Sequence, residues 1–239
     1  MARSARGAAL AALLLAATPL LGGCVTTQQR NERAKLGAKR LLASRLPLRL
    51  GARPTDVRVS RVALIRRRRA SAVVVEVANR GTRPAADVPL EVGIRAGARR
   101  RVLNRRAAWF ENHVASIAPR GRARWVFVTR RALPRGARAF AVAGAPDASL
   151  PGRPQVLPSL TSAAVAGQRP TVKVSNRGSV PQYGLPVYAF ARRGGRYVAA
   201  GRAQLDHLGT RATATVSLSL VGAGRGAALQ TEVLPSIFH

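Results

Sequence analysis

Residues 73–84 read VVVEVANRGTRP and residues 170–181 read PTVKVSNRGSVP, so the same pattern of residues returns 97 positions later. Self-similarity at such a spacing indicates that one structural unit has been duplicated. We therefore predict a first repeat at 54–146 and a second repeat at 155–239. The segment between them, 147–154, contains prolines and is predicted to be a semi-stiff linker.

A second match between the repeats aligns residues 117–121 with residues 205–209, at a shorter offset of 88. The difference between the two offsets predicts nine extra residues in the first repeat. Trp109, Phe110 and His113 lie in this excess. This cluster offers a stacking face for a sugar or a partner protein. The alternative is that Trp109 and Phe110 fill the core.

Apolar residues alternate with a period of two in both repeats, as at Val73, Val75 and Val77 and at Val172 and Val174. Such alternation is typical of half-buried β-strands. The Asn-Arg-Gly triplets are predicted to lie where strands reverse, because Asn and Gly tolerate positive φ. Several short strands within about ninety residues, with no helical period, predict an all-β fold of two tandem antiparallel β-sandwiches, each with about seven strands.

The order of these features resembles the immunoglobulin-like domains of bacterial surface proteins, and most closely the cell-adhesion-related domain of bacteria. The shared pattern is a β-run, Asn-x-Gly, a proline-containing stretch, a second β-run and a later hydrophobic-x-x-x-Gly. The resemblance implies an immunoglobulin-like sandwich that serves as a spacer, an adhesion element or an interaction surface. It marks turn geometry and carries no functional residue to this chain.

The N-terminus has the features of an export signal that ends in a lipidation site. Arg3 and Arg6 precede a short apolar segment that ends in Leu21, Gly22, Gly23 and Cys24, the single cysteine of the chain. The small residues before the cysteine resemble the lipobox of bacterial lipoproteins. We predict a signal peptide at 1–23, acylation of Cys24, and a basic, partly helical tether at 24–53. The alternative is a buried N-terminal helix with an incidental cysteine.

Acylation would hold the exported protein on the cell membrane, with membrane lipid as its first partner, facing the periplasm or the outside. Envelope proteins and cell-wall polymers are the other partners that this location offers. With one cysteine in the sequence, no disulfide framework and no cysteine-based zinc site can form within the chain.

The formal net charge of +32 raises the possibility of a polyanion partner. The 41 basic residues include only three lysines, a bias typical of a GC-rich genome, and aromatics are too few to stack bases between the arginines. We therefore predict no nucleic-acid partner. Two runs, however, are predicted to share one end of the first sandwich: Arg66, Arg67, Arg68 and Arg69, and Arg99, Arg100 and Arg101. Their guanidinium groups could hold phosphates there. The alternative is that both runs are solvated loop tips, where charge is tolerated without a ligand.

The sequence contains no recognisable catalytic or metal motif, and its nine acidic residues and three histidines are too few and too scattered to define one. We predict a non-enzyme without cofactor or metal, whose sandwiches act as a binding, adhesion or spacer module of the cell envelope. A polyanion-binding envelope protein is the alternative function. A hydrolase with a cryptic site is a third hypothesis.

Overall fold

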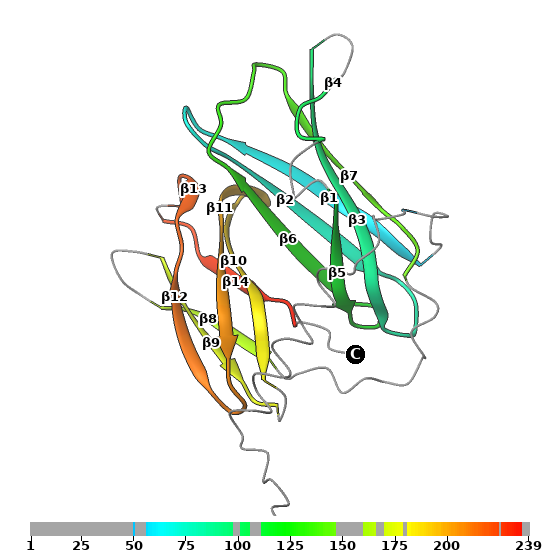
Figure 1. Cartoon of the computed structure of the whole chain (residues 1–239). Coiled ribbons are helices and arrows are strands. Elements are labelled where there is room, and N and C mark those ends of the chain that lie inside the picture. Colours follow the sequence, from blue (N-terminus) through cyan, green and yellow to red (C-terminus); the bar gives the residue numbers. More distant parts are fainter. Residues whose placement is uncertain are drawn as a thin grey trace, which may run out of the picture.

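The computed structural model describes residues 50, 56–97, 101–105, 111–146, 160–165, 170–178, 181–224 and 226–235. Every regular element in these residues is a β-strand, and all the strand pairs are antiparallel (Figure 1). The predicted all-β class of antiparallel sandwiches is confirmed. The predicted signal peptide, tether and linker lie outside the described residues.

The first repeat forms two sheets that face each other. One sheet has the order β1-β2-β6, and in the other β3 is flanked by β4 and β5 along one edge and by β7 along the other. The strands are β1 (Val57–Arg66), β2 (Ser71–Asn79), β3 (Ala85–Ala96), β4 (Arg101–Val102), β5 (Glu111–Ile117), β6 (Arg122–Thr129) and β7 (Arg138–Ala143).

The second repeat builds the same arrangement from its own strands. Its sheets have the orders β8-β9-β12 and β13-β11-β10-β14. The strands are β8 (Leu160–Val165), β9 (Thr171–Asn176), β10 (Gln182–Arg193), β11 (Arg196–Leu208), β12 (Thr213–Ser217), β13 (Leu220–Gly222) and β14 (Leu229–Val233). The order β8-β9-β12 corresponds to β1-β2-β6, and β11-β10-β14 corresponds to β5-β3-β7. The duplication seen in the sequence is thus a duplication of topology.

The Asn-Arg-Gly triplets have a different role from the one predicted. Each follows a strand whose chain then crosses to the opposite sheet, so the triplet does not close a hairpin. Asn79 is 3 % exposed, accepts a hydrogen bond from the Gly81 N–H, and donates to the carbonyls of Arg83, Ile117 and Ala118. Gly81 does not have positive φ. Its lack of a side chain matters because a Cβ there would lie 3.1 Å from Asn79 Oδ1.

The second repeat uses its asparagine in the same way, and this corrects the predicted alignment. Asn176 accepts from the Gly178 N–H and donates to the Gly209 carbonyl, the place that Ala118 has in the first repeat. Arg120 and Arg211 both have positive φ. The backbone N–H of each donates to the carbonyl of the glycine in its own triplet, Gly81 or Gly178. The true offset here is therefore 91, not 88, and the excess in the first repeat is six residues, not nine.

A residue with positive φ is also duplicated, in the strand that follows each triplet. Asp87 in β3 and Gly184 in β10 have φ values of 45° and 59°, and each is skipped in the pairing with the neighbouring strand. Pro89 and Pro186 follow two residues later. The pairing of β3 with β7 begins at Leu90, and the pairing of β10 with β14 begins at Val187. Each proline comes one residue before this point, where its strand is paired on one side only. A missing N–H is tolerated at such a position.

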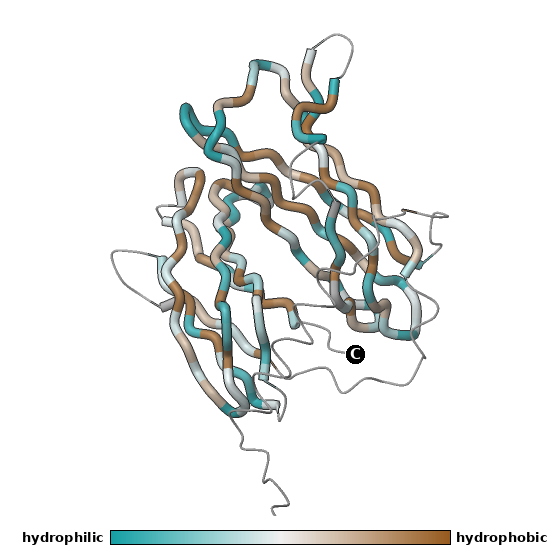
Figure 2. Tube along the Cα trace, in the orientation of Figure 1, coloured by the Kyte–Doolittle hydropathy of each residue, from teal (hydrophilic) through white to brown (hydrophobic). Residues whose placement is uncertain are grey.

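The two repeats share a hydrophobic core. All nine residues of β2 are buried, because one face of β2 packs inside its own sandwich and the other faces the second repeat. The rings of Trp125 and Tyr188, one from each repeat, lie 5.6 Å apart between centroids. Apolar residues therefore continue from one sandwich into the next along β2, β6, β10 and β11 (Figure 2). A smaller core lies inside the second sandwich.

Candidate functional site

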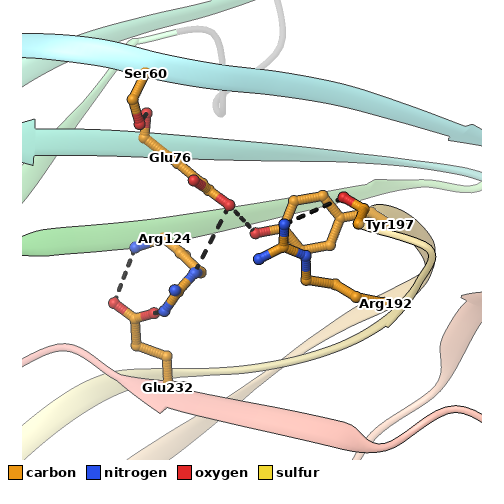
Figure 3. Close-up of polar contacts among 7 residues, drawn as sticks. Ser60, Glu76, Arg124, Arg192, Tyr197 and Glu232 are labelled. Carbon is orange, nitrogen blue, oxygen red and sulfur yellow. Dashed lines mark hydrogen bonds and ion pairs between the residues drawn. The ribbon is translucent and has the colours of Figure 1, made fainter.

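Four side chains from both repeats form a charged cluster in the contact between them (Figure 3). Glu76 on β2 and Arg124 on β6 are cross-strand partners, so both point from the first repeat toward the second. Tyr197 on β11 and Glu232 on β14 come from the second repeat. We call these four residues the inter-repeat cluster.

Arg124 is the centre of the inter-repeat cluster. Its backbone N–H donates to Glu232 Oε1 at 2.8 Å, and its Nη1 donates to Glu232 Oε2 at 3.2 Å. Its Nε lies 3.9 Å from Glu76 Oε1, an ion-pair distance but too long for a hydrogen bond. The Tyr197 hydroxyl donates a hydrogen bond to the same Glu76 oxygen. One guanidinium therefore neutralises two carboxylates that belong to different repeats.

Aromatic rings and arginines surround the inter-repeat cluster. Two guanidinium groups lie near the Tyr197 ring: that of Arg61 is 5.7 Å from the ring centroid, and that of Arg192 is 5.2 Å from it. Arg124 lies 5.2 Å from the Phe190 ring. Tyrosine and arginine are the residues that dominate protein interfaces, because both combine large contact area with hydrogen bonding. Glu76 is only 4 % exposed, although the Arg124 side chain is 28 % exposed. Because its members come from both repeats and pair with one another, this cluster acts as a clamp between the repeats.

Burial changes the proton affinity of the acidic groups in the clamp. Burial raises the pKa of Glu232, an effect that the charge and hydrogen bonds of Arg124 partly offset. Burial, together with the hydrogen bond to Glu76, raises the pKa of Tyr197 to about 12. A tyrosine that donates to a carboxylate resists deprotonation, because the product would be two adjacent negative charges.

The raised pKa of Tyr197 predicts a loss of stability in strong alkali. A group whose pKa is higher in the folded state contributes stability that is complete below its unfolded value, about 10, and is lost as pH rises toward 12. Denaturant-induced unfolding at stepped pH should show this decline. Tyr197→Phe should be less stable than the wild type at neutral pH and should decline less between pH 10 and about 12. Equal declines in the two proteins would contradict the prediction.

Arginines gather at one end of the first repeat, where the β1–β2 turn lies. Arg66 to Arg69 are all exposed, and Arg66 Nη1 donates to the Pro134 carbonyl in the loop between β6 and β7. The arginine-rich end, as we call it, consists of exposed residues from three segments: Arg66, Arg67, Arg68, Arg69, Arg101, Arg130, Arg131 and Arg135. In Figure 1 the turn and β4 both lie at the upper end of the first repeat, with the loop between β6 and β7 drawn between them. Of the second predicted run, Arg99 and Arg100 lie outside the described residues.

The predicted aromatic patch is only partly described. Trp109 and Phe110 lie outside the described residues, whereas His113 is on β5, with its Nδ1 3.1 Å from Asp87 Oδ1. Asp87 is the residue of β3 with positive φ, and it lies two positions before Pro89, the cross-strand partner of His113. This pair was not predicted, since the two residues are far apart in the chain and no sequence motif connects them.

No protein-family model matches this chain, and no curated protein matches it. None of the described residues forms a helix with the length and apolarity needed to cross a bilayer. Within the same described residues, His, Cys, Asp and Glu do not gather in threes as a metal ion would require.

Proposed function

We propose that this protein is a cell-envelope lipoprotein, acylated at Cys24, whose two sandwiches act together as one non-catalytic binding, adhesion or spacer module. The observation that carries this proposal is the core shared by the two repeats, with β2 buried on both faces. Two domains joined only by a linker would move independently. Two domains joined by a core and a charged clamp can hold a binding surface at a fixed orientation.

The direction of β1 supports a surface presented away from the anchor. The segment that carries Cys24 enters the first repeat at Val57, and β1 then runs ten residues to Arg66. At roughly 3.3 Å per residue, this strand covers about 30 Å. The arginine-rich end therefore lies at the opposite end of the first repeat from the point where the N-terminal segment joins it (Figure 1).

Replacing the acylated residue tests the proposed anchor. Cys24→Ser removes the only thiol in the chain, so no other cysteine can accept a lipid. We expect the variant to leave the membrane fraction, whereas the wild type stays there after washing with high salt and partitions into detergent. Ala34→Ser, a change of similar size in the predicted tether, is the control. Retention of Cys24→Ser in the membrane fraction would show that acylation is not the anchor.

Polyanion binding is the second candidate function, and the exposure of Arg66 to Arg69 favours it. Guanidinium groups bind phosphate oxygens in pairs of hydrogen bonds. The second repeat has Ala164-Val165-Ala166-Gly167 at the corresponding place in the sequence, so the arginine-rich end belongs to the first repeat alone. Phosphates of the cell wall or of lipid head groups are the ligands proposed for it.

Charge reversal of Arg66 to Arg69 tests this second function. The fourfold change to Glu should abolish retention on anionic vesicles and on phosphate-bearing wall polymer. Binding by the wild type should weaken steeply as the salt concentration rises, because exposed charges are screened. Reversal of Arg177, Arg193, Arg196 and Arg211, exposed residues of the second repeat, provides a control with the same net charge. Equal retention of the two variants would remove the second function.

A further inference from the structure

A hollow of about 400 Å³ opens beside the arginine-rich end, where β3 and β7 finish their pairing. Its lining comes from the last residues of β3, the first residues of β7 and the loops next to them: Arg95, Ala96, Gly97, Gly136, Arg138, Ala139 and Phe140. Its volume is within the range of small-molecule sites. Arg66 connects this hollow to the arginine-rich end, because it donates to Pro134 in the loop that also supplies Gly136.

Two arginines meet across this hollow. Arg95 and Arg138 are direct cross-strand partners, so their side chains leave the sheet on the same face and next to each other. Like charges directly opposite each other destabilise the pairing of two strands. Among the described residues, neither arginine is paired with a carboxylate. The site therefore has two adjacent positive charges that an anion would relieve.

The aromatic ring in the hollow holds one of these arginines in place. The guanidinium of Arg95 lies 3.9 Å from the centroid of the Phe140 ring, a cation–π contact. Gly93 is the cross-strand partner of Phe140, and a Cβ at Gly93 would lie 2.1 Å from the ring. Glycine thus leaves room for the ring, and the ring orients the guanidinium. An arginine fixed in this way loses less entropy when it binds a ligand.

We propose that Arg95 and Arg138 form a binding site for the phosphate group of an organic phosphate. Two guanidinium groups side by side offer two hydrogen-bonding forks and a charge of +2. This charge matches a phosphate monoester, which carries between one and two negative charges near neutral pH, better than it matches a carboxylate. The inference deepens the second candidate function, since it names a specific site beside the exposed Arg66 to Arg69 turn.

Calorimetric titration of the full-length protein tests the proposal, with the protein in maltoside micelles, which contain no phosphate. Glycerol 3-phosphate is the probe, and acetate at equal concentration is the competitor. R95Q/R138Q should bind glycerol 3-phosphate at least tenfold more weakly than the wild type. R80Q/R83Q, which removes two exposed arginines from the other end of the first repeat, should bind as the wild type does. Phe140→Leu should weaken binding several-fold.

A parallel assay with vesicles of phosphatidylcholine, with or without phosphatidylglycerol, distinguishes the sources of phosphate. If R95Q/R138Q no longer binds the vesicles that contain phosphatidylglycerol, the phosphate of a lipid occupies the site. If the variant still binds these vesicles, the phosphate of a soluble molecule or of a wall polymer occupies it. Equal affinity of R95Q/R138Q and wild type for glycerol 3-phosphate would overturn the proposal, as would equal displacement by acetate. The variant with Arg66 to Arg69 reversed in charge separates this site from the second candidate function. It is expected to lose binding to anionic vesicles and to retain binding of glycerol 3-phosphate.

Discussion

Arg124→Ala is expected to lower the free energy of unfolding by about 3 kcal/mol, because it leaves two buried carboxylates without a counter-charge. Glu76 is 4 % exposed, and the Glu232 side chain is 16 % exposed. Both would then lie in the contact between the repeats with only the Tyr197 hydroxyl and the backbone N–H of residue 124 as hydrogen-bond donors. The cost of burying unpaired charge is much larger than the value of an exposed ion pair.

Urea-induced unfolding at neutral pH measures this effect, and Arg122→Ala is the matched control. Arg122 lies on the same strand and the same face, but it is exposed, so its removal should change stability by less than about 0.5 kcal/mol. A double-mutant cycle of Arg124→Ala with Glu232→Gln isolates the coupling between the repeats. Equal effects of Arg124→Ala and Arg122→Ala would show that the inter-repeat cluster does not hold the repeats together.

The strands and the duplication could be predicted from sequence because both are local patterns. A period of two in the valines identifies strands, and the repeated triplets identify equivalent positions. The alignment of residues 117–121 with residues 205–209 was wrong because it matched Gly121 with Gly209 by residue type. In the structure Gly209 accepts the hydrogen bond of Asn176, and Ala212 stands in place of Gly121. Which backbone group an asparagine reaches is decided by the crossing between sheets, a non-local property.

The contact between the repeats was not predicted, although one signal for it is present. The stretch from Ala72 to Ala78 is apolar at every position except Glu76, which is typical of a strand buried on both faces. The equivalent strand β9 alternates, with exposed Lys173 in the place of Glu76. The predicted alternation at Val73, Val75 and Val77 overlooked Val74, which faces the second repeat. The partners of the Glu76 side chain come from β6 and β11, and the second carboxylate bound by Arg124 comes from β14. No spacing along the chain connects these residues.

The hollow beside the arginine-rich end shows the same limit on prediction. Arg95 and Arg138 are single arginines among 41 basic residues, and nothing in the sequence distinguishes them from the rest. Their importance follows from the pairing register of β3 with β7, which also places Gly93 beneath Phe140. The runs Arg66–Arg69 and Arg99–Arg101 attracted attention because they are contiguous. Contiguity identifies an exposed turn, whereas a site depends on residues that register brings together.

Asn79→Ala is expected to lower the free energy of unfolding by about 2–3 kcal/mol. The side chain makes four hydrogen bonds to backbone groups on both sides of the crossing, and alanine would leave the Gly81 N–H and the carbonyls of Arg83, Ile117 and Ala118 without this partner. Asn79→Asp should be at least as destabilising, because a carboxylate can still accept from Gly81 but would face three carbonyl oxygens.

The second repeat provides an internal test of the same argument, because Asn176 bridges Gly178 and Gly209 in the equivalent crossing. Asn176→Ala should therefore destabilise to a similar extent, whereas Arg80→Ala, an exposed change within the first triplet, should have little effect. Since the repeats share a core, each asparagine variant should still unfold in a single transition when followed by tryptophan fluorescence and by far-ultraviolet circular dichroism. Two separated transitions in Asn176→Ala would mean that the repeats fold independently and that the shared core contributes little to their coupling.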